Sequence, residues 1–157
     1  MSDVFDRITA LLREYHLPFE LLEHEHVHTS ADAAKVRGTL LEEAAKALVL
    51  HDRTNNAFFM CIVSGHKKLD LKKIKQVRNA TNVSLAHPED VLKATGCPVG
   101  TVPPFPVLFG LDGYCDGGVL ENEYVVFSAG SNYVSIRMAS KEWSGVAGVV
   151  VHDLAQN

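Results

Sequence analysis

The chain has 157 residues, of which 46% are hydrophobic and 22% are charged, and its formal net charge is −4. This length allows one domain with a real core, expected to span residues 1–157, and is too short for two comfortable ones. The acidic balance argues against a broadly basic nucleic-acid surface, and no apolar run approaches the roughly 18 residues that cross a membrane.

The cysteines and the first residues predict a cytoplasmic protein. The N-terminal residues up to Arg7 are polar and acidic and do not resemble a signal peptide. Cys61, Cys97 and Cys115 are odd in number, widely spaced and without a CxxC pair. Neither a disulfide framework nor a zinc ribbon is therefore predicted, and a reducing cytoplasm fits best.

The first predicted element is an amphipathic helix over residues 3–16. Val4, Ile8 and Leu11 recur at helical spacing, and Ser2 can cap the start. Pro18 follows the end of this helix, and residues 19–23 after it predict a strand.

A short helix and a hairpin come next. Ser30 can cap a helix that ends at Arg37, and Gly38 suits the position after it. The segment 41–50 is ambiguous, since its Glu-Glu-Ala-Ala start favours a helix and its Ala-Leu-Val-Leu end favours a buried strand. We place strands at 45–51 and 58–63 and join them by a turn.

The rest of the chain predicts mixed helices and strands. Helices are expected at 69–80, from Pro88 to Thr95, and at 140–146. Strands are expected at 83–86, 107–109, 124–128, 133–138 and 148–152, with a glycine-rich turn around Gly110, Gly113, Gly117 and Gly118 and a hairpin turn at 129–132. Because strands and helices do not alternate strictly, the predicted class is α+β.

The loop at residues 96–106 concentrates rigidity in one place. It contains Gly96, Gly100 and four of the 6 prolines. Proline fixes φ and glycine permits positive φ, so this run predicts a stiff loop whose bare amides can hold a ligand's polar atoms, or a plain structural loop. Cys97 within it is a candidate nucleophile or a small apolar loop residue.

Three other features suggest chemistry. The basic residues Lys67, Lys68, Lys72, Lys73, Lys75 and Arg78 gather in one stretch, which is either a solvated helix face or a patch for phosphates. His24, His26 and His28 share one face of an extended segment and suggest a metal site, although a straight strand converges poorly on one ion. No G-x-S-x-G elbow or glycine-rich phosphate loop occurs.

Lys46 directly precedes the apolar run 47–50. If that run is an interior strand, the ammonium group has to project from a largely apolar element into a cavity, and lysine is seldom buried without a partner. The alternative is a lysine that leans out from the end of a helix.

Four motifs together resemble the YbaK/ProX family of aminoacyl-tRNA deacylases, which is related to the editing insertion of bacterial prolyl-tRNA synthetases. They are Lys46 with its apolar run, Leu69-Asp70-Leu71-Lys72-Lys73, the glycine–proline loop from Thr95 to Phe105, and Ser128-Ala129-Gly130-Ser131. The resemblance extends from about Phe19 to Asp153. It implies a mixed β-sheet, curled into a partial barrel and wrapped by helices.

The resemblance also implies an activity and a site. Members hydrolyse the ester that joins a wrong, usually small, amino acid to tRNA, and the ribose hydroxyl of the tRNA helps to position the water. Lys46 matches the family's key lysine. The implied substrate-binding residues are His24, Gly96, Gly100, Thr101, Pro103, Gly130 and Ser131, with Lys67, Lys68, Lys72 and Lys73 for the tRNA phosphates.

The expected partners are a mischarged tRNA and, as a second candidate, an aminoacyl-tRNA synthetase, with no cofactor, metal or membrane. The chain would be a monomer or a weak dimer. Thr101 and Pro106 stand where many relatives have glycine, and Ser131 stands where some present a histidine or a basic residue. Two alternatives remain open, a non-catalytic aminoacyl-tRNA or nucleotide-binding module and a histidine-based metal hydrolase.

Overall fold

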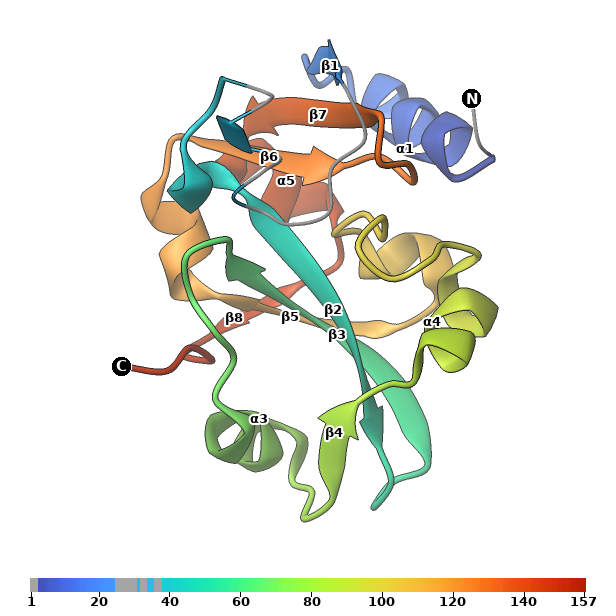
Figure 1. The fold of residues 1–157 in the computed structure, drawn as a ribbon, viewed down its shortest axis with the longest axis vertical. Coiled ribbons are helices and arrows are strands. Elements are labelled where there is room, and N and C mark those ends of the chain that lie inside the picture. Colours follow the sequence, from blue (N-terminus) through green and yellow to red (C-terminus); the bar gives the residue numbers. More distant parts are fainter. Residues whose placement is uncertain (1–2, 25–30, 32–33, 36–37) are drawn as a thin grey trace.

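The computed structural model describes residues 3–24, 31, 34–35 and 38–157 and arranges them as two β-sheets surrounded by helices (Figure 1). The three-stranded sheet contains β1 (Glu20–Glu23), β7 (Val134–Ala139) and β6 (Tyr124–Ser128), in that order. The five-stranded sheet contains β4 (Val83–Leu85), β2 (Ala45–Asp52), β3 (Ala57–Ser64), β5 (Asp112–Asp116) and β8 (Val150–His152).

The helices lie around these sheets. The α-helices are α1 (Asp3–Glu14), α3 (Leu71–Arg78), α4 (Pro88–Thr95) and α5 (Ser140–Val146). Short 3-10 helices are η1 (Leu41–Glu43), η2 (Pro106–Phe109) and η3 (Gly117–Glu121). Within the described residues, no helix is long and apolar enough to cross a bilayer.

The sheet topology confirms the predicted α+β class. β2 and β3 form an antiparallel hairpin, whereas β5 pairs in parallel with β3 and β8. A parallel bridge between Ala44 and Val126 links the two sheets. The curled sheet expected from the family resemblance therefore consists of two sheets that do not close into a barrel.

Side-chain alternation along β2 divides the core into two clusters. Ala45 and Val49 face the larger cluster, which also includes the apolar face of α1. Leu50 faces the smaller cluster with Ile74 of α3. Because residues two apart share one face of a strand, Lys46 lies on the same face as Leu50, at the end of β2 that is nearest β6.

Most of the predicted elements are confirmed. The elements α1, β1, the β2–β3 hairpin, α3, β4, α4, β6, β7, α5 and β8 all occur within a few residues of their predicted bounds. The lysine alternative at a helix end is wrong, because Lys46 is the second residue of β2. The helix predicted from Ser30 to Arg37 and its Ser30 cap fall largely outside the described residues.

The segment around Pro106 corrects the prediction. Residues 107–109 form η2, not a strand, and η2 ends at Gly110 with a φ of 65°. The strand is β5, within the segment that was predicted to be a glycine-rich turn. Gly113 lies inside β5. This position requires glycine, because a Cβ there would come within 2.1 Å of Pro106 Cγ and 2.8 Å of the Gly148 oxygen. Its glycine thus permits close packing and does not form a turn.

Gly113→Ala is expected to lower the free energy of unfolding by about 1–3 kcal/mol or more, because the added methyl group overpacks the contact with Pro106. Urea denaturation measures this loss. Gly145→Ala is the control, since a Cβ there meets nothing within 4 Å and alanine favours the helix α5 by about 1 kcal/mol. Equal midpoints for the two variants would contradict the packing explanation.

Candidate functional site

The 96–106 loop and the β6–β7 turn meet in the structure. The Gly130 N–H donates a hydrogen bond to the Thr101 oxygen at 3.1 Å. The Ser128 hydroxyl lies 3.4 Å from the Gly100 oxygen. Gly100 and Gly130 have φ values of 89° and 85°, which glycine adopts without strain. The glycine–proline loop is therefore fixed against the end of the three-stranded sheet.

Hydrogen bonds within the loop make it stiff. The Thr101 N–H and hydroxyl both donate to the Pro98 oxygen, at 3.1 Å and 2.8 Å. The indole N–H of Trp143 donates to the Pro104 oxygen at 2.9 Å. Thr101 is 3% exposed, so its side chain closes a turn inside the loop and its backbone oxygen contacts the Gly130 turn.

The two glycines of the loop differ in what their amides can do. The Gly96 N–H donates to the Leu92 oxygen at 2.8 Å and ends α4. The Gly100 N–H has no hydrogen-bond partner among the residues that the structure describes, and Gly100 is exposed. Gly100 thus offers a backbone donor to a bound ligand, whereas the amide of Gly96 is already in use.

Cys97 is buried beneath the loop. It is 1% exposed, and burial raises the pKa of its thiol above the ordinary value of 9.0. A thiol in this environment stays protonated and is a poor nucleophile. The geometry therefore favours the interpretation of Cys97 as a small apolar loop residue.

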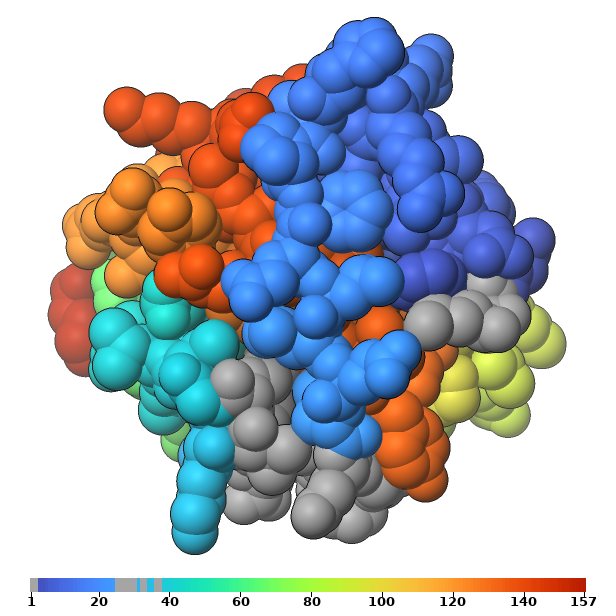
Figure 2. Space-filling view, turned by 90° about the horizontal axis from the view of Figure 1, so that it is seen from above, coloured from blue at the N-terminus to red at the C-terminus, as the bar shows by residue number. Residues whose placement is uncertain are grey.

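His24 lies at the end of β1 beside the β6–β7 hairpin. Its ring Nε2 is 2.7 Å from the Ser135 hydroxyl, and its backbone N–H donates to the Tyr133 oxygen at 2.9 Å. Ser135 pairs directly with Ser128 across β6 and β7. The cross-strand pair places His24 on the same side of the sheet as the Ser128 contact to Gly100. Figure 2 shows this side, where the blue segment up to His24 crosses beside the orange-red hairpin.

Ser131 lies in the same hairpin turn. Its hydroxyl accepts a hydrogen bond from the Tyr133 N–H at 3.0 Å. Ser131 therefore stabilises the turn, and it lies on the segment that follows Gly130 at the mouth of the site.

Lys46 is half-buried on β2. Its Nζ donates to the Lys67 oxygen at 3.1 Å, which leaves further N–H donors of the ammonium for a ligand. The parallel bridge joins Ala44 to Val126. Both chains run in the same direction from that bridge, so Lys46 and Ser128 each lie two residues beyond it. The two strands β2 and β6 thus start side by side, and β6 continues to the turn that contacts the 96–106 loop.

The environment of Lys46 lowers its pKa below the ordinary value of 10.5. Burial is the main cause, and the positive charge of Lys68 adds to it. Lys46 therefore loses its proton at a lower pH than a free lysine does. Its protonated form is the one that can bind an anion or a carbonyl oxygen.

Lys68→Gln is expected to raise the pKa of Lys46, because it removes the repelling charge and leaves the burial unchanged. A titration of the lysine 13Cε shifts by NMR measures this pKa directly. Lys67→Gln is the matched control, since it removes a neighbouring charge that does not act on Lys46 to the same extent. A Lys46 midpoint that shifts only in Lys67→Gln would contradict the assignment.

The basic stretch separates into exposed and engaged side chains. Lys68 and Lys72 are exposed. Lys73 Nζ donates to Asp153 at 3.0 Å and to the Ala155 oxygen at 2.7 Å. The structure thus gives Lys73 a role in holding the C-terminal segment beside α3.

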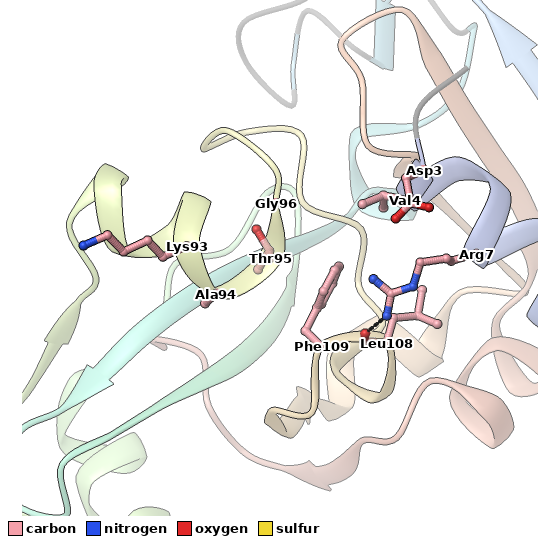
Figure 3. Close-up of a pocket in the computed structure, with 9 residues that line it drawn as sticks. All are labelled: Asp3, Val4, Arg7, Lys93, Ala94, Thr95, Gly96, Leu108 and Phe109. Atoms are coloured by element: carbon pink, nitrogen blue, oxygen red, sulfur yellow. Dashed lines mark hydrogen bonds between the residues drawn. The ribbon is translucent and has the colours of Figure 1, made fainter.

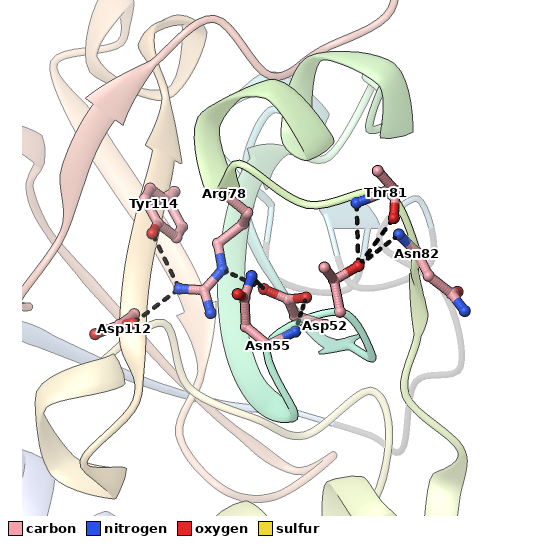
Figure 4. A network of polar contacts seen from close by, with 8 residues as sticks. Asp52, Asn55, Arg78, Thr81, Asn82, Asp112 and Tyr114 are labelled. Carbon is pink, nitrogen blue, oxygen red and sulfur yellow. Dashed lines mark hydrogen bonds and ion pairs between the residues drawn. The ribbon is translucent and has the colours of Figure 1, made fainter.

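Arg78 does not belong to a phosphate-binding patch. Its side chain is 9% exposed and makes hydrogen bonds to Asp52, Asp112 and Tyr114 (Figure 4). The predicted patch therefore ends before Arg78, because this guanidinium is fully used inside the protein.

No group of three or more histidine, cysteine or acidic side chains could hold a metal ion among the described residues. His24 instead contacts Ser135, while His26 and His28 lie outside the residues that the structure describes.

A depression of about 400 Å³ lies behind the 96–106 loop, between α1, α4 and η2 (Figure 3). Arg7 spans it, because its guanidinium donates to the Leu108 oxygen and lies 5.6 Å from the ring centre of Phe109. Thr95 and Gly96 form the wall that it shares with the loop. Sequence reasoning missed this depression, because it depends on contacts between segments about a hundred residues apart.

Comparisons with known proteins agree with this geometry. The aminoacyl-tRNA editing domain family matches residues 24–145, which include Lys46, the glycine–proline loop and the Gly130 turn. The multifunctional Ser/Thr-tRNA deacylase ProXp-y of Escherichia coli is 29% identical over 149 residues, covering 93% of this chain and 89% of the relative. The prolyl-tRNA editing protein ProX of Acetoanaerobium sticklandii is 26% identical over 106 residues, covering 68% and 65%.

The fold agrees as well. A crystal structure described as that of a candidate trans-editing enzyme for prolyl tRNA synthetase superposes with a TM-score of 0.84 at 27% identity, covering 100% of this chain and 99% of that one. Because the family match spans well over half of the sequence, this chain belongs to the aminoacyl-tRNA editing domain family.

Proposed function

We propose that the protein is a trans-editing deacylase that hydrolyses the ester of a mischarged tRNA carrying a small amino acid. The observation that carries this proposal is the half-buried Lys46, which follows the bridge from Ala44 to β6, the strand that leads into the Gly130 turn held against the stiff loop. The relatives named as Ser/Thr-tRNA deacylase and prolyl-tRNA editing protein support the reaction class.

In this proposal, Lys46 binds the end of the tRNA by charge. One of its N–H groups is held by the Lys67 oxygen, so the ammonium has a fixed direction before the substrate arrives. A charge-assisted hydrogen bond to the terminal phosphate or the ester carbonyl is stronger than a neutral one. Attack by water is the simplest route, because no activated nucleophile is present among the described residues.

The loop provides the other half of the site. The exposed Gly100 N–H can donate to the oxyanion that develops on the ester carbonyl. Pro103 and the buried Thr101 fix the loop's shape, so the space for the amino acid cannot widen easily. A difference of one methylene is worth only about 1–3 kcal/mol in binding, so a separate pocket that admits only small side chains is useful for correcting errors.

The tRNA phosphates would bind Lys67, Lys68, Lys72 and Lys73, with the exposed Lys68 and Lys72 contributing most. An aminoacyl-tRNA synthetase is the second proposed partner, since such an enzyme releases the mischarged tRNA. Both partners belong to the cytoplasm.

Lys72→Gln is expected to weaken tRNA binding and to reduce the slope of log affinity against log salt by about 1, because one phosphate contact is lost. Filter binding at several KCl concentrations measures the slope. Lys141→Gln on α5 is the control, as it removes an exposed lysine far along the chain from α3. An unchanged slope in Lys72→Gln would remove this residue from the tRNA surface.

The function is tested with purified protein and a set of mischarged tRNAs. Seryl-, threonyl- and alanyl-tRNA represent small amino acids, and phenylalanyl-tRNA is the size control, each with and without a chelator. Turnover of the small set alone, unaffected by the chelator, is the expected result. Binding without turnover would indicate a non-catalytic module, and chelator-sensitive turnover would indicate a metal hydrolase.

A further inference from the structure

The side chain of His66 is held by a hydrogen-bond chain that sequence reasoning did not single out. Its Nδ1 lies 2.9 Å from the hydroxyl oxygen of the fully buried Ser64. The Ser64 hydroxyl in turn lies 2.6 Å from the Glu42 oxygen in η1. Asn122 Nδ2 donates to the same Glu42 oxygen at 2.8 Å. The imidazole is therefore attached to a buried polar anchor, while His66 itself is exposed.

These contacts fix which nitrogen of His66 carries a proton. A carbonyl oxygen can only accept, so the single Ser64 proton must point at the Glu42 oxygen. At 2.6 Å the two oxygens would otherwise repel each other. The Ser64 oxygen is then an acceptor toward His66, and Nδ1 has to be its donor. In the neutral ring this leaves Nε2 as an unprotonated acceptor on the side away from Ser64.

His66 lies beside the residue that holds Lys46 of the proposed site. His66 directly precedes Lys67, whose oxygen holds the ammonium of Lys46. The Ser64 anchor is opposite Ala45 in the β2–β3 hairpin, one residue before Lys46 on β2. A short stretch of chain thus presents a cation and a bare imidazole nitrogen at the same end of the hairpin.

We propose that His66 is the general base of the deacylation, an inference that rests on the proposed function. Nε2 takes a proton from the attacking water, whose oxygen bonds to the ester carbonyl carbon. The bond from that carbon to the ribose oxygen then breaks, and the electron pair and the proton from Nε2 go to the ribose oxygen. Nδ1 keeps its proton and its Ser64 bond throughout, so the ring does not turn as Nε2 gains and loses a proton.

The tautomer is tested without any substrate. Long-range 15N–1H NMR spectra of the neutral His66 ring should show the proton on Nδ1, whereas free histidine prefers Nε2. Ser64→Ala should return the ring toward the Nε2–H form. A wild-type ring protonated on Nε2 would overturn the proposal, whatever the protein's activity.

The catalytic role is tested by single-turnover deacylation of the best small mischarged tRNA. His66→Ala is expected to lower the rate by about 10²-fold or more, and imidazole in the buffer should restore part of it. His87→Ala, at an exposed histidine before α4, should change neither rate nor imidazole response. A rate that is unchanged, or lost without rescue, refutes the base. Wild-type protein without turnover would instead refute the proposed function.

Discussion

Lys46→Ala is expected to lower the single-turnover rate of deacylation by about 10²–10³-fold, the usual effect of removing a donor that stabilises charge in a transition state. The half-buried ammonium is the positive group that β2 would contribute to the proposed site, and the Lys67 oxygen holds it. Rapid-quench measurements with excess enzyme separate this step from product release.

Two further variants show whether charge or structure causes the loss. Lys46→Gln removes the positive charge and keeps a polar, although shorter, side chain on β2. If charge matters, it should be nearly as slow as Lys46→Ala. Lys93→Ala removes an exposed lysine of α4 and should retain the wild-type rate. If Lys46→Gln has normal turnover, the positive charge of Lys46 has no part in the reaction and its role is structural.

Local patterns explain why so much of this site could be predicted. The stiff loop follows from proline and glycine, whose backbone preferences act within a few residues. Lys46 stood out because it directly precedes a continuous apolar run, and the structure places it on β2. In both cases the signal lies in neighbouring residues, so the sequence alone carries it.

Long-range contacts explain what could not be predicted. Gly113 suggested a turn, but its glycine serves the packing of Pro106 and Gly148 against β5. Pro106 and Thr101 stand where many relatives have glycine. In the structure Pro106 packs against Gly113, and Thr101 closes a turn onto Pro98. Both departures thus have structural partners that no local pattern reveals.

The ion pair of Arg78 and Asp52 is expected to be the largest single contribution of a polar contact to stability. Asp52 is fully buried, and its carboxylate accepts from Arg78 Nε at 3.1 Å and from Asn55. The guanidinium also contacts Asp112 at 2.8 Å (Figure 4), and it lies 4.5 Å from the ring centre of Phe59. Arg78→Met should lower the free energy of unfolding by about 3–5 kcal/mol, because it leaves a buried carboxylate without its cation.

Urea denaturation of three variants tests this explanation. Adding Asp52→Asn to Arg78→Met removes the buried charge and should recover part of the lost stability. If the two residues acted independently, their losses would add and no stability would be recovered. Asp153→Asn is the control, since Asp153 is 77% exposed and its pair with Lys73 is worth about 0–1 kcal/mol. Equal losses for Arg78→Met and Asp153→Asn would show that burial does not strengthen the Arg78 pair.

The same pair predicts how stability depends on pH. Burial alone would raise the pKa of Asp52, but hydrogen bonds from Asn55 and the charge of Arg78 outweigh it and hold the pKa below 3.8. The stabilisation is therefore fully present above pH 3.8 and is lost as the pH falls through the lower pKa of the folded state. Arg78→Met should flatten this acid dependence.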